Sequence, residues 1–339
     1  MDNAPLINRL LSGIVIFKLK GKYVKVKPAR VEDKAFADFY AQEVYQEALL
    51  DGMLTNAEVT QLLMERGWWT EENNTNLQTL TKNLEQMKLD YYVNFFKEDT
   101  KQYIKGAVER QVKKINKLYE TKQLFFDITC EYLRDFARTV VLTEKLCVFE
   151  DGELVVNSIP SNEVVNAVLK EGLGEETIRN MAKSYKWRSY WNAKDCTPVF
   201  EDKACNLNDE QLSLIGWSRY YDSVYESMDR PSDEVIADNL ALDGWSISQD
   251  RKRKEEEKKA EGEKLLSDNM QNAGEVFVPV KSQREQDNVL ALNDAHGQSV
   301  LASKKKQFEK GGSFKENELN HVRKEIQMEA LRQQKESRR

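Results

Sequence analysis

The chain has 339 residues, of which 40% are apolar and 32% charged, and its formal net charge is −6 at pH 7. This length suffices for about two domains, and the composition indicates a soluble protein that is more charged than average. No apolar run approaches the roughly 20 residues that a membrane-spanning helix needs, so we expect no membrane partner. The first residues lack a basic region and a cleavage site, which argues against a secretory signal peptide.

Charged and aromatic residues divide the chain near residue 250. Residues 251–339 hold 20 of the 51 basic and 16 of the 57 acidic residues, which leaves a net charge of −10 on residues 1–250. Three of the 32 aromatic residues lie beyond residue 250. The first part can therefore build an apolar core. The last 89 residues bury too little apolar surface to offset their ordering entropy, unless a partner supplies surface.

The first predicted element is a β-hairpin over residues 17–27. Phe17 and Leu19 alternate with lysines, Gly21 provides a turn, and Val24 and Val26 alternate with lysines again. Period-two alternation places the apolar side chains on one face and the lysines in water. We expect a small sheet that covers a helical body, with a phosphate-binding lysine face as the alternative.

Apolar stripes with helical spacing follow the hairpin. A stripe of this kind lies on one helix face and requires a partner helix, so the successive stripes, joined by short connections, predict a helical bundle. The stripes comprise Phe36, Tyr40, Val44 and Ala48, then Leu77, Leu80, Leu84, Met87 and Tyr91, then Ile104, Val108, Val112, Ile115 and Tyr119, and then Phe125, Ile128, Tyr132, Phe136 and Val140.

The segment LTNAEVTQLLMERGWW, residues 54–69, is a short predicted helix with recognisable ends. Thr55 and Glu58 have the spacing of a capping box. Gly67 suits the left-handed position that follows a last helical turn. We expect Trp68 and Trp69 to anchor this corner to the core.

The chain then turns to a second hairpin and a second group of helices. A hairpin is predicted over residues 148–156, with a turn at Asp151-Gly152. Helices begin at Ser161 and near Glu175, and a capping-box pattern precedes a further helix with an apolar stripe. That pattern and stripe comprise Asn208, Gln211, Leu214, Trp217, Tyr221, Val224 and Met228.

The segment KSYKWRSYWNAK, residues 183–194, interleaves basic and aromatic side chains. Base stacking combined with phosphate pairing would use such a pattern, with Lys186, Trp187, Arg188 and Trp191 as the contacting residues. The alternative is a helix whose aromatic residues face a core. The net charge of −10 on the surrounding residues repels nucleic acid, so nucleic-acid binding is the alternative function rather than the main one.

The stretch PSDEVIADNLALDGW, residues 231–245, places four carboxylates in fifteen residues. A calcium-binding EF-hand loop fails here, because setting Gly244 at the sixth position puts Ala241 where an oxygen ligand is needed. A helix beginning near Pro231 fits better, with Asp233 and Glu234 in its first turn, where the helix dipole favours acids.

The end of the same stretch leads into the charged part of the chain. Asp243-Gly244 is interpreted as the helix end or a turn, and Trp245 as the last large anchor of the core. We therefore expect a docking and hinge surface. Its predicted partner-binding residues are Asp233, Glu234, Asp238, Asp243 and Trp245.

Beyond this stretch the chain becomes a charged helix and an extended arm. Residues 251–264 carry 12 charged residues in 14, and oppositely charged residues four apart support a solvated helix. GEVFVPV, residues 274–280, reads as a short strand or extended clip. Phe277 and Val278 within it are further predicted partner-binding residues.

Metal and catalytic chemistry lack their usual patterns. The spacings of the four cysteines are 17, 49 and 9, which fit no zinc motif, and without a secretory signal we expect free thiols. The only histidines, His296 and His321, lie in the polar tail, so a base for a serine or cysteine nucleophile is missing. Phosphate-binding and dinucleotide-binding motifs are absent from the sequence. We expect no enzyme activity, no cofactor and no metal.

One part of the chain resembles a known family. The stretch LNDEQLSLIGWSRYYDSVYESMDRPSDEVIADNLALDGWSISQDRKRKEEE, residues 207–257, is followed by AGEVFVPV at 273–280 and NVLALNDAHGQS at 288–299. Together these resemble a family of tailed-bacteriophage structural and assembly proteins, over roughly residues 205–310. The resemblance implies a structural or assembly role rather than a reaction, and it leaves the first 200 residues unassigned.

The sequence therefore predicts a mainly α-helical protein with small β-hairpins, followed by a charged helix and an extended arm. The predicted domains are residues 1–157, 158–250 and 251–339. We expect a non-enzymatic phage protein, either a tail or baseplate component or a tail assembly chaperone, in the host cytoplasm during assembly or in the virion. Its expected partners are other phage structural proteins and a second copy of the chain.

Overall fold

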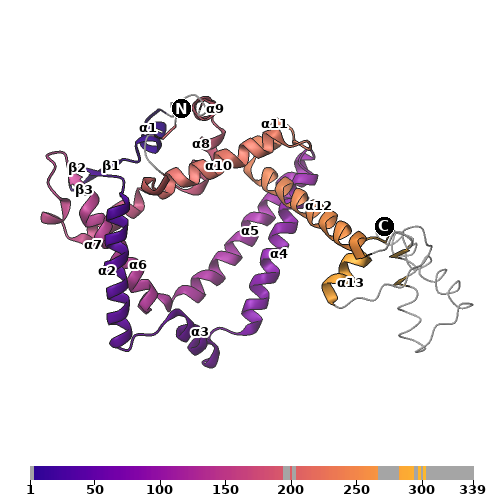
Figure 1. Ribbon diagram of the computed structural model, residues 1–339, viewed down its shortest axis with the longest axis horizontal. Helices are drawn as coiled ribbons and strands as arrows, with labels where there is room; N and C mark the ends of the chain where they lie inside the picture. Colours follow the sequence, from indigo (N-terminus) through magenta and orange to yellow (C-terminus); the bar gives the residue numbers. More distant parts are fainter. Residues whose placement is uncertain are drawn as a thin grey trace, which may run out of the picture. The chain divides into compact units, whose positions relative to one another are not determined.

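The computed structural model describes residues 4–193, 199–200, 204–265, 282–293, 297–298 and 301–302. The fold is mainly α-helical with one small antiparallel sheet (Figure 1), which confirms the predicted fold class. The chain divides into two compact units, Met1–Trp245 and Ser246–Arg339. The sequence instead predicted a further boundary at residue 157. The N-terminal helix bridges that boundary, because Arg9 Nη2 lies 2.6 Å from Glu210 Oε1.

The first unit begins with a helix, Ala4–Ser12, that the sequence did not predict, and the later elements follow the predicted order. Its helices, 3-10 turns and strands are α1 (Ala4–Ser12), β1 (Val15–Leu19), β2 (Lys22–Val26), α2 (Val31–Leu50), α3 (Asn56–Glu65), α4 (Glu71–Val93), α5 (Glu98–Gln123), η1 (Phe126–Ile128), α6 (Cys130–Leu146), β3 (Cys147–Phe149), η2 (Val155–Asn157), α7 (Ser161–Lys170), α8 (Glu175–Lys183), α9 (Tyr185–Asn192), η3 (Ala204–Asn206), α10 (Asp209–Glu226) and α11 (Asp233–Ala237). Helix α12 (Asn239–Leu265) begins in this unit and runs into the second.

The first predicted hairpin and one strand of the second form a sheet of order β1-β2-β3, in which all neighbours are antiparallel. The return arm of the second predicted hairpin is reduced to a single bridge between Val148 and Leu154, and the 3-10 helix η2 follows it. Phe17 pairs with Val24, and Val24 pairs with Phe149, so their side chains share the buried face. Gly152 has a φ of +87° at the second turn, a backbone conformation that glycine adopts without strain. The sequence predicts the first hairpin and the turn of the second, but the pairing of β2 with β3 joins residues more than 120 positions apart.

Helices α2 and α6 pack side by side (Figure 1), and their contact corrects the predicted stripe. The buried residues of α2 are Ala37, Ala41 and Ala48, whose small side chains let the two helices approach closely. Phe36 and Tyr40, which were predicted to be in the core, face solvent.

The predicted stripe that begins at Phe125 is also wrong over most of its length. Helix α6 starts only at Cys130, after Thr129 caps it by accepting a hydrogen bond from the Tyr132 backbone N–H. Ile128 precedes the helix and is exposed, and Tyr132 and Phe136 lie within α6 but away from its buried residues Cys130 and Thr143, so they are exposed as well.

The corner around α3 confirms the predicted helix ends. Thr55 and Glu58 form the capping box, and Gly67 has a φ of +69°. The two tryptophans differ, because Trp69 is buried whereas Trp68 is 58% exposed and stacks on Phe125.

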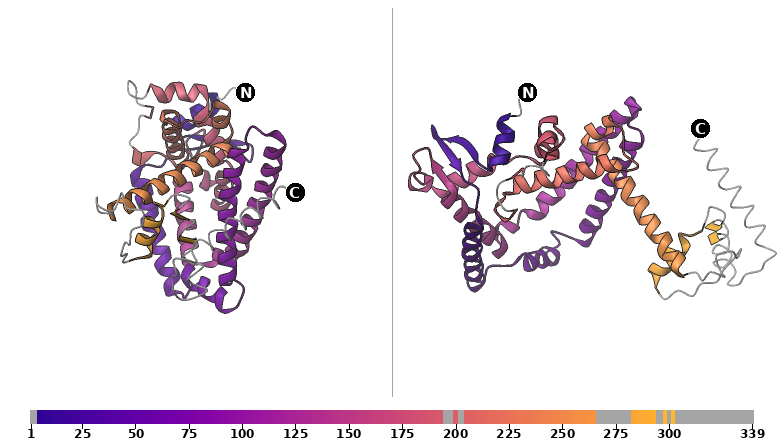
Figure 2. Two further views of the ribbon diagram at one scale, coloured as in Figure 1. Left: turned by 90° about the vertical axis from the view of Figure 1, so that its right-hand side faces the viewer. Right: turned by 45° about the horizontal axis from the view of Figure 1, so that its top comes forward.

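Helices α4 and α5 follow as an antiparallel pair, which Figure 2 shows from two further directions. The pair is cross-linked where Gln111 Nε2 donates to the Leu80 carbonyl at 3.0 Å. The two helices are partners as predicted, and Val108 and Ile115 of the α5 stripe are buried, whereas Tyr119 at its end is exposed.

The largest apolar cluster of the first unit lies among α1, α8, α9, α10, α11 and the start of α12. Trp187, Tyr221 and Leu242 are fully enclosed there. The capping box of Asn208 and Gln211 begins α10 as predicted. This cluster fixes the surroundings of the acidic stretch, residues 231–245.

The second unit contains the rest of α12 and helix α13 (Gln283–Leu290). The solvated helix was predicted from its charge spacing, and Lys259 Nζ lies 2.9 Å from Glu255 Oε1. Helix α13 approaches α12 at Gly262, where an added Cβ would lie 2.4 Å from the Asn288 carbonyl oxygen. The predicted partner residues Phe277 and Val278 lie outside the described residues.

Candidate functional site

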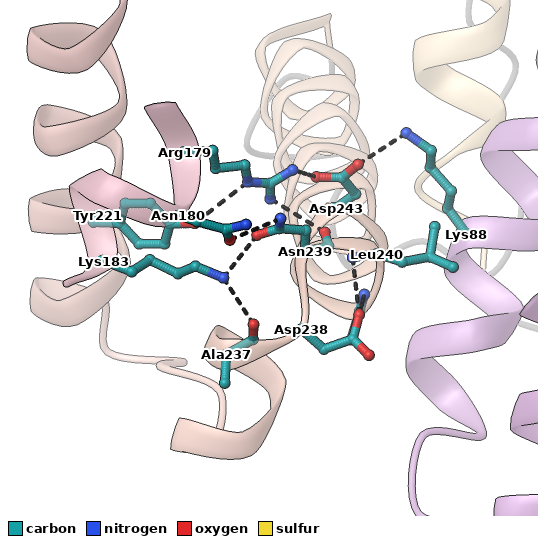
Figure 3. A network of polar contacts seen from close by, with 11 residues as sticks. Lys88, Arg179, Asn180, Lys183, Tyr221, Ala237, Asp238, Asn239, Leu240 and Asp243 are labelled. Carbon is teal, nitrogen blue, oxygen red and sulfur yellow. Dashed lines mark hydrogen bonds and ion pairs between the residues drawn. The ribbon is translucent and has the colours of Figure 1, made fainter. Parts of the chain in front are cut away.

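Residues 231–245 fold as α11 and the first turns of α12, and their polar side chains join a cluster between helices (Figure 3). We call this the polar cluster. It contains Lys88 and Tyr91 from α4, Arg179, Asn180 and Lys183 from α8, Tyr221 from α10, and Asp238, Asn239 and Asp243.

Asp243 is the centre of the charge pairing in this cluster. Its Oδ1 lies 2.7 Å from Arg179 Nη1 and its Oδ2 lies 2.9 Å from Lys88 Nζ. Burial alone would lower the pKa of Arg179, but the charge of Asp243 and the contacts with Tyr221 together outweigh it and the pKa is raised. Arg179 therefore remains charged, although it is almost fully buried. The two ion pairs of Asp243 tie α8 and α4 to α12.

Arg179 is held by further contacts on its other side. Its guanidinium lies 4.4 Å from the centroid of the Trp217 ring, which is a cation–π contact. Its Nη2 donates to the Asn239 carbonyl at 3.2 Å and its Nε to Tyr221 Oη at 3.3 Å. A buried charge requires such compensation by hydrogen bonds.

Asp238 begins helix α12. Its Oδ1 accepts hydrogen bonds from the backbone N–H groups of Leu240 and Ala241, at 2.9 and 3.1 Å. A helix start leaves such groups without partners, and an aspartate is well suited to accept them. Its Oδ2 accepts a hydrogen bond of 2.8 Å from Tyr91 Oη. Burial, together with this carboxylate, raises the pKa of Tyr91, so the phenol keeps its proton.

Lys183 closes the end of α11. Its Nζ donates to the Ala237 carbonyl at 2.7 Å and to Asn239 Oδ1 at 2.8 Å. Burial, and then the charge of Arg179, lower the pKa of Lys183. The amine serves a helix terminus, where orphan carbonyl groups need donors.

Gly244 corrects the predicted helix end. It lies inside α12, where an added Cβ would be 2.1 Å from the Lys88 carbonyl oxygen and 2.7 Å from Tyr92 Cβ. The glycine is thus required by the close approach of α4 rather than by a turn. Local sequence favoured a turn because glycine lowers helix propensity, and tertiary packing overrides that preference.

The predicted docking surface at residues 231–245 is mostly occupied by contacts within the chain. Asp238 and Asp243 belong to the polar cluster, and Trp245 is buried with its Nε1 donating to the Asp229 carbonyl. Asp233 pairs with the neighbouring Arg230. Glu234 is exposed. Trp245 is therefore a core residue, and the expectation of a free surface around it is wrong.

The predicted nucleic-acid segment also faces inward. Trp187 and Trp191 are buried, and their indole N–H groups donate to Ser218 Oγ at 2.8 Å and Asp222 Oδ2 at 2.7 Å. Arg188 lies 2.8 Å from Asp222, and Lys186 is exposed. The two tryptophan rings are thus unavailable for base stacking, which removes the main argument for the alternative function.

The described residues offer few candidates for a metal site or for a reactive thiol. Among those residues, no group of three or more His, Cys, Asp or Glu side chains is arranged to hold a metal ion. Cys130 and Cys147 are buried, and burial raises the pKa of Cys147 to about 12. Cys205 is exposed.

None of the described helices is both long enough and apolar enough to span a bilayer.

A second candidate region is the solvent-facing side of α2, which includes Phe36 and Tyr40 of the predicted apolar stripe. We call it the outer face of α2 and define it by Phe36, Phe39, Tyr40, Glu43 and Glu47. The exposed fractions of the three aromatic residues are 56%, 65% and 45%, and both glutamates are exposed. Exposed aromatic residues at spacings of three and four form one continuous helix face.

The residues missed by sequence reasoning leave modest signals in the sequence. Arg179 lies between Ile178 and Met181 on the buried face of α8, and an arginine at an apolar position indicates a buried ion pair. Ala37 and Ala41 offered a second stripe that also leads to Ala48, and small residues indicate close helix packing.

Comparisons of this chain with protein-family models, with curated proteins and with solved structures give no significant match.

Proposed function

We propose that this chain is a non-enzymatic structural or assembly protein that acts through protein–protein contacts. The observation that carries the proposal is the outer face of α2, where Phe36, Phe39 and Tyr40 are exposed on a helix whose opposite face is already packed. Contiguous exposed apolar surface on a soluble protein marks a site of interaction. A helix that is apolar on two faces needs a second covering surface.

The polar cluster also supports a structural role, because its ionisable side chains are engaged in contacts within the fold. Its ionisable groups pair with one another, as in Arg179 with Asp243 and Tyr91 with Asp238. Such pairing fixes helices against one another, and it leaves these groups engaged in the fold rather than poised to transfer a proton. The cluster thus fits a scaffold.

The phage assignment within this proposal depends on the resemblance of residues 207–257 to tailed-bacteriophage proteins. On that basis the chain is a tail or baseplate component or a tail assembly chaperone. It would act in the host cytoplasm during assembly or as part of the virion, and its partners would be other phage structural proteins.

The test is cross-linking of the tagged full-length chain in infected cells, with mass spectrometry of the cross-linked peptides and of purified virions. The proposal expects a virion protein joined to the chain. Presence in the purified virion would identify a particle component, and absence would identify an assembly factor. Recovery of no virion protein by cross-linking, together with absence from the virion, would contradict the proposal. A matched Phe36→Ser/Phe39→Ser variant tests whether recovery depends on the outer face of α2.

A further inference from the structure

We infer that the outer face of α2 binds an amphipathic helix of a partner protein whose apolar stripe is flanked by lysines or arginines. The inference rests on the proposed function and specifies the chemistry of the partner. Two observations support it, namely the exposed aromatic residues and the uneven pairing of the acidic residues of α2.

The apolar part of the face has helical geometry. Phe36, Phe39 and Tyr40 are spaced three and four apart, so their rings project from the same side of α2. The opposite side is filled by the contact of the alanines with α6. An amphipathic helix that docks into such a surface places its own apolar residues against the rings.

The acidic residues of α2 fall into two groups. Those nearer α6 are paired, since Asp33 Oδ1 lies 2.7 Å from Lys145 Nζ and Asp38 Oδ1 lies 2.5 Å from Arg138 Nε. The side-chain hydrogen bond from Lys145 lowers the pKa of Asp33. The two α2 acids nearest α6 are therefore paired within the fold, although Asp38 is itself exposed.

The acids of the solvent side lack such partners. Glu32, Glu43 and Glu47 are exposed, and none of the three forms an ion pair with another described residue. They lie before and after the three aromatic rings along the same helix. An apolar patch between unpaired carboxylates is complementary to an apolar stripe between basic residues.

The same charges argue against the other occupants. A second copy would place one set of glutamates against another, and like charges across an interface destabilise it. Nucleic acid and anionic membranes are repelled for the same reason. From Glu32 to Glu47 the face is about 22 Å long, at 1.5 Å per residue, so it matches a partner helix of about four turns.

The experiment uses the full chain and three synthetic 18-residue helices as probes. All three peptides have the same leucine stripe, and the residues that flank it are lysines, glutamates or serines. Fluorescence anisotropy measures binding of each labelled peptide. We expect the lysine peptide to bind at least tenfold more tightly than the glutamate peptide, and its affinity to fall as salt is raised.

Three variants locate the binding. Phe36→Ser/Phe39→Ser should abolish binding of the lysine peptide, and Glu43→Lys/Glu47→Lys should reverse the preference toward the glutamate peptide. Tyr103→Ser is the matched control, because Tyr103 is 74% exposed on α5, away from this face. This variant should bind as the wild type does. Circular dichroism verifies that each variant is folded.

Equal binding of the three peptides, binding of none of them, or an unchanged affinity in Phe36→Ser/Phe39→Ser would overturn the inference. These outcomes are separate from failure of the proposed function. If infected cells yield a virion partner that cross-links elsewhere, the inference fails while the proposed function stands. If the lysine peptide binds α2 but no virion partner is recovered, the inference stands and the phage role fails.

Discussion

The polar cluster and the outer face of α2 contain the same kinds of residue, acids beside aromatic rings, in opposite environments. Asp243 has two cations within 3 Å, and Asp238 accepts a hydrogen bond from the buried Tyr91. Glu43 on α2 is exposed, and so is its neighbour Phe39. The comparison teaches that the packing of neighbouring helices decides which acid–aromatic pair stabilises the fold and which remains for a partner.

The largest effect on the fold is expected from Trp245. Its replacement by alanine leaves a cavity among α10, α11 and α12, and we expect the unfolding free energy to fall by about 3–5 kcal/mol. Trp68→Ala is the matched control, because Trp68 is 58% exposed and should lose about 1 kcal/mol or less. Urea unfolding measures both. Equal losses in the two variants would show that burial does not distinguish these tryptophans.

Arg179→Met should have the next largest effect. The substitution keeps most of the side-chain volume but leaves Asp243 with Lys88 as its remaining cation. Breaking a buried pair by removing one partner destabilises a protein by about 3 kcal/mol or more. Arg134→Met, which affects an exposed pair with Asp135, is the control and should change stability little. An Arg179→Met protein as stable as the wild type would contradict the structural role of the polar cluster.

Gly244→Ala should destabilise the chain although alanine is the better helix former. The added Cβ would meet the Lys88 carbonyl, and overpacking of this kind costs about 1–3 kcal/mol. Gly216→Ala is the matched control within α10, because nothing lies within 4 Å of a Cβ there. This control should gain up to about 1 kcal/mol. Thermal unfolding of the two variants should therefore shift in opposite directions, and shifts of the same sign would contradict the close helix approach.

Tyr91→Phe should reveal a pH-dependent contribution of the polar cluster. At neutral pH the loss of the hydrogen bond to Asp238 should cost about 1–2 kcal/mol. Burial raises the folded-state pKa of Tyr91 above its unfolded value, which is about 10. The stabilising contribution is therefore complete below pH 10 and is lost as pH rises toward the folded-state pKa. Urea unfolding at pH 7 and pH 11 should show the difference between wild type and Tyr91→Phe shrink, and a constant difference would contradict this linkage.

The sequence predicts local features of this protein better than its long-range contacts. Capping boxes at Thr55 and Asn208 and the turn at Gly67 depend on neighbouring residues, so spacing reveals them. The buried face of α2 could not be deduced in this way, because Phe36 and Ala37 both begin helical stripes and only the position of α6 decides between them. Gly244 is a similar case, since the Lys88 carbonyl that requires it lies 156 positions away in the chain.

The central claim is that the exposed aromatic rings of α2 bind a partner, whereas the buried Trp245 stabilises the fold. The smallest expected effect on stability tests this claim most directly. The measurement is the unfolding free energy of Phe39→Ala, determined by urea unfolding beside Trp245→Ala. Phe39 is 65% exposed, so we expect a change within about 0.5 kcal/mol of the wild type. A loss as large as that of Trp245→Ala would mean that Phe39 packs within the fold, and it would contradict the account.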